Sequence, residues 1–190
     1  SDDKLLNIDE LSIPGEHNLQ NFLAASTCSH LMGISQNQIV KSMKEFKGVE
    51  HRLEYVRTIN EADYINDSKS TNIDSVIVAI DTYKQPIVLI LGGFNKGANF
   101  RLLLPHIKSS HVRDIVSYGD AGGQINTALG DAVRSVQVTD LSSAVKKAQL
   151  MAAPGDIVLL SPGCASYDEF SNFEERGNHF KSIIKNLETS

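Results

Sequence analysis

The architecture of this chain is clearest in one stretch, Ile157-Val-Leu-Leu-Ser-Pro-Gly-Cys-Ala-Ser-Tyr-Asp-Glu-Phe-Ser-Asn-Phe-Glu-Glu-Arg-Gly-Asn-His-Phe180. It begins with the apolar run 157–160, which is typical of a buried parallel strand. Small and polar residues follow, and in open α/β sheets the loop at the carboxyl end of a strand lines the ligand crevice. The stretch then continues as a predicted helix, whose apolar residues recur at helical spacing: Phe173, Phe180, Ile183, Ile184 and Leu187.

An ordinary corner between a strand and a helix explains the same loop. Ser166 with Glu169, and Ser171 with Glu174, both have the Ser-x-x-Glu form of a capping box. On these residues alone, the corner is the simpler interpretation.

Outward from this stretch, apolar runs alternate with helical patterns. Strands are predicted over 49–56, 62–66, 87–91, 112–118, 135–138 and 156–160, and helices over 73–80, 122–129 and 142–152. Such alternation implies βαβ units and therefore an α/β fold with a mainly parallel, Rossmann-like sheet that has helices on both faces.

The first part of the chain has a different pattern. One or two short strands are predicted over 5–13, then a helix from Asn18 that ends at Gly33, then a second helix capped by Ser35. Two helices form a partial layer rather than a domain. We therefore place a boundary at Phe46-Lys-Gly48, which separates a segment 1–47 from a domain 48–190.

Composition argues against a nucleic-acid-binding protein and against a membrane-spanning one. The 190 residues are 41% apolar and 22% charged, with a formal net charge of −5, so no sequence-wide basic field attracts nucleic acid or an anionic membrane. No apolar run approaches the roughly 20 residues that cross a bilayer.

Cys28 and Cys164 are interpreted as reduced thiols of a cytoplasmic protein. Ser1-Asp-Asp-Lys4 has no signal-peptide character, and we expect the chain to begin inside a longer protein.

Two further loops have compositions suited to anions. Asn66-Asp-Ser-Lys-Ser-Thr-Asn72 places hydroxyls and one cation where a helix begins, although a solvated loop with Thr71 or Asn72 as the helix cap explains it equally well. Gly92-Gly-Phe-Asn-Lys-Gly97 follows a predicted strand, and its glycines allow a ligand close approach. It matches neither the dinucleotide fingerprint nor the phosphate loop. No histidine pair has metal-ligand spacing, so no metal site is predicted in this chain.

Taken together, these motifs resemble the Mur ligase family. Ser161 to Gly177 is similar to the signature of the members that add D-glutamate, and Asn66 to Asn72 matches the family's Asn-Asp-Ser-Lys-x-Thr-Asn. Gly92 to Gly97 resembles its Gly-Gly-x-x-Lys-Gly loop. Gly15-Glu-His-Asn-Leu-Gln-Asn21 resembles the end of its central, ATP-binding domain. The chain departs from the family pattern at Asn95 and Asn99, where Asp is frequent, and at Tyr167, where Leu or Phe is common.

The resemblance implies an enzyme that phosphorylates UDP-N-acetylmuramoyl-L-alanine with ATP and Mg²⁺, giving an acyl phosphate that D-glutamate then attacks during synthesis of a peptidoglycan precursor. It implies that 1–47 is the end of the central ATP-binding domain and that 48–190 is the amino-acid-binding domain. No phosphate loop occurs in the chain. The N-terminal and central domains, with the magnesium ligands, are therefore expected elsewhere, and the isolated chain is expected to be inactive.

Residue roles follow from the resemblance. Thr71, Lys96 and Ser166 would hold D-glutamate, with the Tyr167 backbone and Phe173 bordering the pocket, and Lys69 and Lys96 would be catalytic. Asn18 and Asn21 would line the adenine, Arg52 would face phosphate, and Asp67 would accept from ribose hydroxyls. By residues alone, Asn18 is a helix cap and His51-Arg52 is a surface pair on a strand.

Other functions remain open. Another amino-acid-adding Mur ligase or a folylpolyglutamate synthetase would share the architecture, and a non-catalytic Rossmann-like binding module is a more distant alternative. The Asn-Phe-Glu-Glu-Arg-Gly run and Lys96 favour D-glutamate addition.

Overall fold

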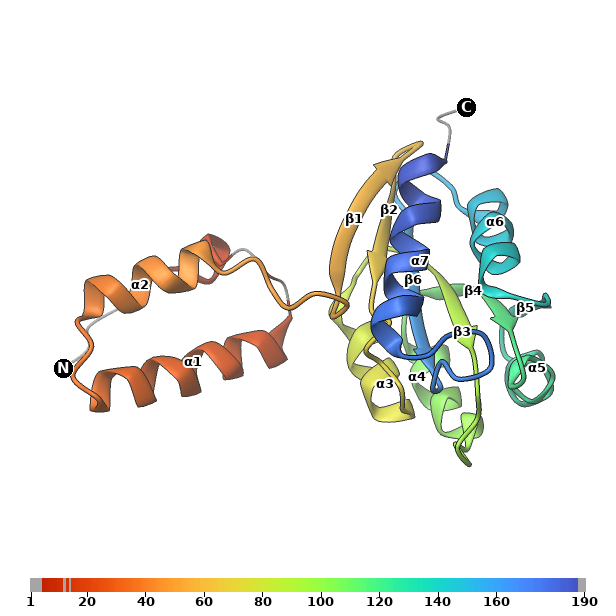
Figure 1. Ribbon diagram of the computed structural model, residues 1–190, viewed down its shortest axis with the longest axis horizontal. Helices are drawn as coiled ribbons and strands as arrows, with labels where there is room; N and C mark the ends of the chain where they lie inside the picture. Colours follow the sequence, from red (N-terminus) through yellow and green to blue (C-terminus); the bar gives the residue numbers. More distant parts are fainter. Residues whose placement is uncertain (1–4, 12, 14, 188–190) are drawn as a thin grey trace. The chain divides into compact units, whose positions relative to one another are not determined.

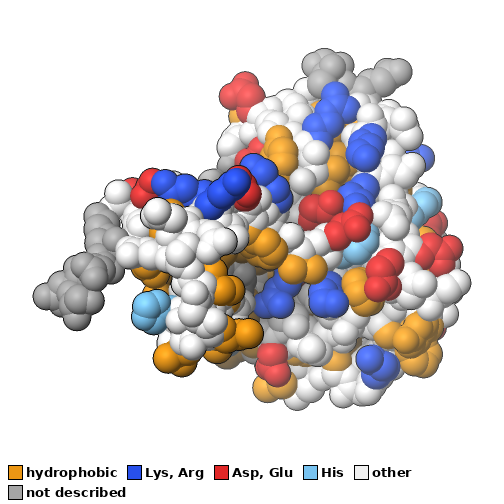
Figure 2. Space-filling model, turned by 60° about the vertical axis from the view of Figure 1, so that its left-hand side comes forward, with side chains coloured by type: hydrophobic (Ala, Val, Ile, Leu, Met, Phe, Trp, Pro, Cys, Tyr) orange, Lys and Arg blue, Asp and Glu red, His pale blue; other side chains and the backbone are white. Residues whose placement is uncertain are grey.

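The computed structural model describes residues 5–11, 13 and 15–187. It divides into two compact units, Ser1–Gly48 and Val49–Ser190 (Figure 1). The segment Ser1 to Lys4, expected to begin inside a longer protein, lies outside the described residues. No helix among the residues described has the length and apolar character to cross a membrane. In Figure 2, the visible face of the described chain mixes Lys and Arg side chains with Asp and Glu side chains.

The N-terminal unit consists of a 3-10 helix η1 (Ile8–Glu10) and the helices α1 (Glu16–Leu31) and α2 (Gln36–Glu45). The prediction of short strands over 5–13 was wrong, because the described part of that segment forms η1 and contains no strand. The cap of α1 is Gly15, so Asn18 lies inside the first turn and does not cap the helix.

The ends of these helices follow from local chemistry. Gly33 adopts φ +83°, and the N–H groups of Gly33 and Ile34 donate to the carbonyls of His30 and Ser29, which closes α1 as a Schellman motif. Ser35 caps α2, as predicted, and forms a capping box with Gln38. The small core of this unit is built from Phe22, Ile39 and Met43.

The C-terminal unit contains one six-stranded sheet in the order β1-β2-β6-β3-β4-β5. β1 and β2 pair antiparallel, and all other neighbours pair parallel. The strand bounds are β1 Glu54–Ile59, β2 Ala62–Asn66, β3 Ile87–Gly92, β4 Val112–Tyr118, β5 Arg134–Gln137 and β6 Ile157–Gly163. The predicted α/β fold with a mainly parallel, Rossmann-like sheet is therefore confirmed.

Helices cover both faces of this sheet (Figure 1). Leu89 and Leu91 of β3 belong to the apolar core shared with α3 (Ile73–Thr82), η2 (Phe100–Leu103), α4 (Leu104–Ser109) and α5 (Gly122–Leu129). Val88 and Ile90 belong to the core shared with α6 (Leu141–Met151) and α7 (Phe173–Asn186). Every residue of β3 and β6 is buried, as expected for central parallel strands covered on both sides.

The chain order of the strands creates a crevice. β6 is last in sequence but lies between β2 and β3, and its helix α7 packs on the face opposite α3. Loops that leave neighbouring strands toward opposite faces open a crevice at the carboxyl ends, where α/β proteins bind ligands. The fold therefore directs attention to the loops after β2, β3 and β6.

β1 begins later than predicted. Residues 50–53 form a turn and bend instead of a strand, and His51 and Leu53 have φ values of 63° and 45°. The Glu54 carboxylate accepts from the His51 N–H at 2.9 Å. This hydrogen bond stabilises a turn where alternation alone predicted the start of a strand.

Candidate functional site

Three loops meet at the carboxyl ends of β2, β6 and β3. The Gly163 N–H donates to the Ser70 carbonyl at 2.9 Å, which ties the loop after β2 to the end of β6. Phe94 and Ala165 exchange two backbone hydrogen bonds, at 2.9 and 3.1 Å, which join the loops after β3 and β6. The segments containing the predicted D-glutamate residues are therefore joined directly.

The loop after β2 presents Lys69 and Thr71. Asn72 caps α3 by accepting from the Ser75 N–H at 2.9 Å, which confirms one of the two predicted caps. The Lys69 ammonium lies 4.5 Å from the centre of the Phe173 ring, and a cation in this position is attracted to the ring face. Two predicted site residues from distant parts of the chain are thus in contact. Thr71, two positions after Lys69 in the sequence, is half-buried.

In the loop after β3, the Asn95 side chain fixes the backbone on the C-terminal side of Lys96, whose own side chain is exposed. The Asn95 Oδ1 accepts from the N–H groups of Gly97 and Ala98 at 2.9 and 2.7 Å. Its Nδ2 donates to Gln124 Oε1 at 2.7 Å. An aspartate, which is frequent at this position in the family pattern, has no proton to donate to that oxygen when ionised.

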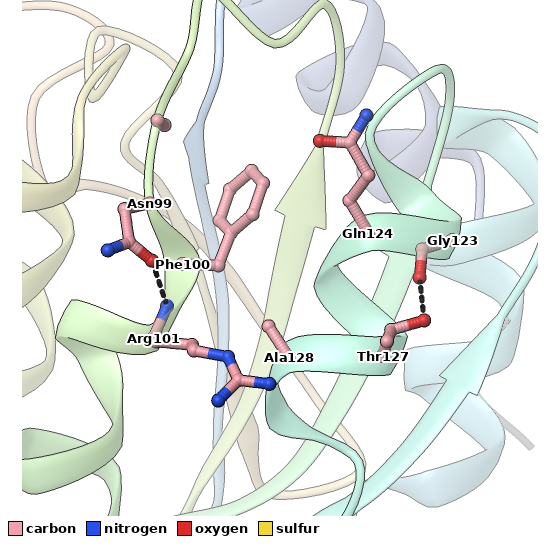
Figure 3. Close-up of a pocket in the computed structure, with 8 residues that line it drawn as sticks. Asn99, Phe100, Arg101, Gly123, Gln124, Thr127 and Ala128 are labelled. Carbon is pink, nitrogen blue, oxygen red and sulfur yellow. Dashed lines mark hydrogen bonds between the residues drawn. The ribbon is translucent and has the colours of Figure 1, made fainter.

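A cavity of about 410 Å³ lies beside this loop (Figure 3). Asn99 and Arg101 border it on one side, where the Asn99 side chain accepts from the Arg101 N–H at 3.2 Å. Gln124 and Thr127 of α5 border it on the other side. Asn99, the second departure from the family pattern, therefore caps η2.

The loop after β6 differs from the predicted capping boxes. The cap of α7 is Asn172, whose Oδ1 accepts from the Glu175 N–H at 2.7 Å, not Ser171. Ser166 accepts through its backbone carbonyl, and the carboxylate of Glu169 accepts from the Leu141 N–H. Both capping-box interpretations were wrong, because the Ser-x-x-Glu pattern does not determine which residue is the N-cap of the helix.

The side chains of this loop have different exposures. Ser166 is 2% exposed, whereas Tyr167 is 67% exposed. Burial raises the pKa of the nearby Cys164 thiol to about 12. Cys164 is therefore not a nucleophile at neutral pH, and both Cys28 and Cys164 are free thiols.

Asp67 lies at the base of the loop after β2 and is 5% exposed. Its carboxylate accepts from the Leu53 N–H at 3.2 Å and from the Ser161 hydroxyl at 2.8 Å. Burial raises the pKa of Asp67 to about 7, although these two hydrogen bonds and the charge of Arg52 oppose the shift. Arg52 itself is exposed.

Asn18 and Asn21 belong to α1 of the N-terminal unit. Asn18 is half-buried and Asn21 is exposed. Three residues apart on a helix, they lie on one face. Their predicted place beside an adenine stays a prediction, as does the assignment of the first unit to a central ATP-binding domain.

Comparison with known proteins identifies the family. The model of the family described as "Mur ligase, glutamate ligase domain" matches residues 51–164, which is more than half of the chain. The chain belongs to the Mur ligase family.

Its curated Mur ligase relatives are longer than the chain. It is 46% identical over 181 residues to the UDP-N-acetylmuramoylalanine--D-glutamate ligase of Pelotomaculum thermopropionicum, a match that covers 94% of the chain and 40% of the relative. It is 43% identical over 187 residues to the enzyme of the same name from Staphylococcus saprophyticus, covering 97% of the chain and 41% of that relative. The chain thus spans about two fifths of the length of these relatives.

Solved structures support the fold. The UDP-N-acetylmuramate-alanine ligase MurC of Thermotoga maritima matches with a TM-score of 0.69 at 18% identity, over 92% of this chain and 39% of that one. The folylpolyglutamate synthase of the same organism matches with a TM-score of 0.62 at 15% identity, over 95% and 41% of the two chains. At these identities the likeness concerns the architecture alone.

Sequence reasoning missed two buried residues of this candidate site. Arg176 is 0% exposed and His51 is 3% exposed, so the surface interpretation of His51 was wrong. Burial, followed by the charge of Lys181, holds the pKa of His51 below its ordinary value. Helical spacing could have revealed Arg176, because it shares a face with Phe173 and Phe180. No local pattern marks His51.

Proposed function

We propose that this chain is the D-glutamate-binding part of an ATP-dependent ligase that joins D-glutamate to UDP-N-acetylmuramoyl-L-alanine. The observation that supports this function best is the meeting of three loops at one sheet edge. These loops contain Lys69, Thr71, Lys96 and Ser166. The similarity to D-glutamate ligases, at 43–46% identity, favours this amino acid over the substrates of other Mur ligases.

The reaction explains why such a set of side chains is required. A free carboxylate does not form an amide with an amine directly, so its oxygen first takes the γ-phosphoryl group of ATP and ADP leaves. The amine of D-glutamate then attacks the acyl carbon, the amide bond forms with loss of a proton from the nitrogen, and phosphate leaves with the former carboxylate oxygen. Throughout, the two carboxylates of D-glutamate must be held, and charge-assisted hydrogen bonds do this most strongly.

We assign the D-glutamate carboxylates to Lys96, Thr71 and Ser166. Phe173 and the Tyr167 backbone would border the pocket, and the 67% exposure of Tyr167 leaves its hydroxyl free to reach a ligand. Lys69, fixed over Phe173, would lie where charge develops during transfer.

The nucleotide roles are those that the resemblance implies. Arg52 is exposed and fits a role opposite phosphate, Asp67 would accept from ribose, and Asn18 and Asn21 would face adenine. ATP supplies the phosphoryl group and Mg²⁺ offsets its charge when bound, with the magnesium ligands in the N-terminal and central domains of the complete ligase. Because catalysis requires positioning by all domains, the chain by itself would not ligate.

The test uses the complete protein that contains this chain. Phosphate release would be followed with ATP, Mg²⁺ and UDP-N-acetylmuramoyl-L-alanine, offering D-glutamate, L-glutamate, L-lysine or diaminopimelate in turn. Release that depends on D-glutamate alone supports the proposal. Preference for another amino acid would overturn the assigned substrate, and no release with any would favour a non-catalytic binding module. Ligation by the 190-residue chain alone would refute its proposed inactivity.

A further inference from the structure

Arg176 occupies an unusual position for an arginine. Its side chain is 0% exposed, and its guanidinium donates four hydrogen bonds. Nε donates to Ser68 Oγ at 2.9 Å and Nη2 to the Ser68 carbonyl at 2.8 Å. Nη1 donates to the carbonyls of Cys164 and Ala165 at 3.1 and 3.2 Å.

These partners lie on different loops. Ser68 belongs to the loop after β2, which contains Lys69 and Thr71, whereas Cys164 and Ala165 precede Ser166 in the loop after β6. Arg176 is thus one rigid group bonded to both walls of the proposed pocket. A guanidinium suits this task because its donors are fixed in a planar fork.

The loop after β3 also packs against this group. A Cβ atom added at Gly93 would lie 3.1 Å from Arg176 Nη1 and 2.3 Å from the Ala165 carbonyl oxygen. Gly93 has φ +118°, so both its backbone and its surroundings favour glycine. Lys96 lies three residues after Gly93, so the segment that contains it packs against the guanidinium at its start.

The charge of Arg176 is not neutralised by an ion pair. Within the described part of the chain, no carboxylate oxygen lies within 4 Å of its guanidinium, and all four acceptors are uncharged. Burial of a charge without a counter-ion in contact is costly. Burial raises the pKa of Glu169 and the charge of Arg176 acts against this shift, but the two groups form no ion pair. An anionic ligand nearby would offset part of this cost, because electrostatic attraction is stronger where water is excluded.

We propose that Arg176 is a positioning residue for D-glutamate, one that sets the spacing of the three loops and supplies a buried positive charge beneath them. This inference rests on the proposed function. Arg176 does not contact the substrate. It determines where Thr71, Lys96 and Ser166 stand relative to one another.

Nucleotide binding is expected to depend less on this residue. Asp67 is held by Leu53 and Ser161, not by Arg176. A general loss of folding would change the response to both substrates to a similar extent. Displacement of the two loops that Arg176 joins would affect D-glutamate more than ATP, because Asp67 keeps its hydrogen bonds from Leu53 and Ser161.

The kinetic test compares Arg176→Lys and Arg176→Met with the wild type in the complete ligase. Lysine keeps the charge but cannot replace the fork, so we expect the KM for D-glutamate to rise about 10- to 100-fold, the scale of one or two lost charged hydrogen bonds. The KM for ATP should change less than about threefold. Methionine should raise the KM for D-glutamate further, because it also removes the charge. An unchanged KM for D-glutamate in Arg176→Lys would overturn the proposal.

Arg113→Lys is the matched control. Arg113 also ties segments together, since it donates to Asp114 at 2.8 Å and to the Met151 carbonyl at 2.5 Å and pairs with Asp156 at 2.9 Å. It lies at the amino end of β4, away from the three loops. Arg113→Lys should lower stability without changing the KM for D-glutamate, and a rise equal to that of Arg176→Lys would show that destabilisation alone explains the effect.

A second measurement separates this inference from the proposed function. The sample is the 190-residue chain without substrate. Arg176→Lys should accelerate amide hydrogen exchange in residues 67–72 and 164–172 together by about tenfold or more, the scale of one lost charged hydrogen bond. Arg113→Lys should leave the exchange of both segments unchanged. Unaltered exchange in both segments would refute the bridging role. If phosphate release by the wild-type ligase did not depend on D-glutamate, the proposed function would fail. Faster exchange in Arg176→Lys would then still show that Arg176 joins the two loops, but its role with D-glutamate would be refuted.

Discussion

Asparagine in place of Asp67 should change how the stability of the chain depends on pH. Burial raises the pKa of Asp67 from 3.8 to about 7. Between these values the native carboxyl keeps a proton that the unfolded chain has released, so the free energy of unfolding falls as the pH rises. A shift of about 3 pH units, at about 1.36 kcal/mol each, corresponds to about 4 kcal/mol lost by pH 8.

Asp67→Asn removes this titration and keeps the shape of the side chain. Its Oδ1 can still accept from the Leu53 N–H, and the Ser161 hydroxyl can rotate to accept from the new amide. Urea unfolding at intervals from pH 4.5 to 8.5, followed by circular dichroism, gives the free energy of unfolding for both proteins. The advantage of the variant should grow with pH by about 2–4 kcal/mol, because other groups contribute equally to both proteins.

Asp114→Asn provides a control of opposite sign. Burial acts to raise the pKa of Asp114, but hydrogen bonds and charges from Arg134 and Arg113 outweigh it and hold the pKa below the ordinary value. The stability that Asp114 contributes is therefore present at neutral pH and lost in acid, and Asp114→Asn should be destabilising at pH 7. A pH-independent difference between Asp67→Asn and wild type would refute the reasoning about Asp67.

Three further substitutions test separate parts of the account. Lys96→Ala in the complete ligase should weaken D-glutamate binding by about 2–3 kcal/mol, roughly 30- to 150-fold, and a loss within about threefold by calorimetry would show that Lys96 was wrongly assigned. Asn172→Ala should lower the free energy of unfolding by about 1 kcal/mol in urea, since it removes the cap of α7; no loss would contradict the observed cap. Gly177→Ala places a Cβ atom 2.2 Å from the Nδ1 of His51, so unfolding should become easier by about 1–3 kcal/mol. The control Gly123→Ala meets nothing closer than 3.8 Å and should be neutral or stabilising, and equal effects would refute the steric argument.

The sheet could be predicted because each strand and helix has a recognisable pattern within its own stretch of sequence. Apolar runs such as 157–160 and 87–91 are long enough to identify central strands, and the helical patterns between them require parallel pairing. Errors occurred where several local solutions compete. Residues 5–13 contain only short apolar pairs. The alternation of Leu53, Tyr55 and Arg57 predicted a strand from residue 49, but the turn at 50–53, where Glu54 accepts from the His51 N–H, delays its start.

The interior of the site could not be read from local patterns. Arg176 and Ser68 are 108 positions apart in sequence yet share two hydrogen bonds, and His51 lies against Gly177. Neither pairing follows from periodicity, since both depend on the place of β6 between β2 and β3. The motifs identified the loops, and the topology determined which of their residues face inward.

A crystal structure of the complete ligase with bound D-glutamate would test the central proposal most directly. We expect one carboxylate of D-glutamate within hydrogen-bonding distance of Lys96 or Thr71 and the other near Ser166, with the Phe173 ring beside them. Electron density for D-glutamate elsewhere, with the loops after β2, β3 and β6 empty, would contradict the proposal that these loops form its binding site.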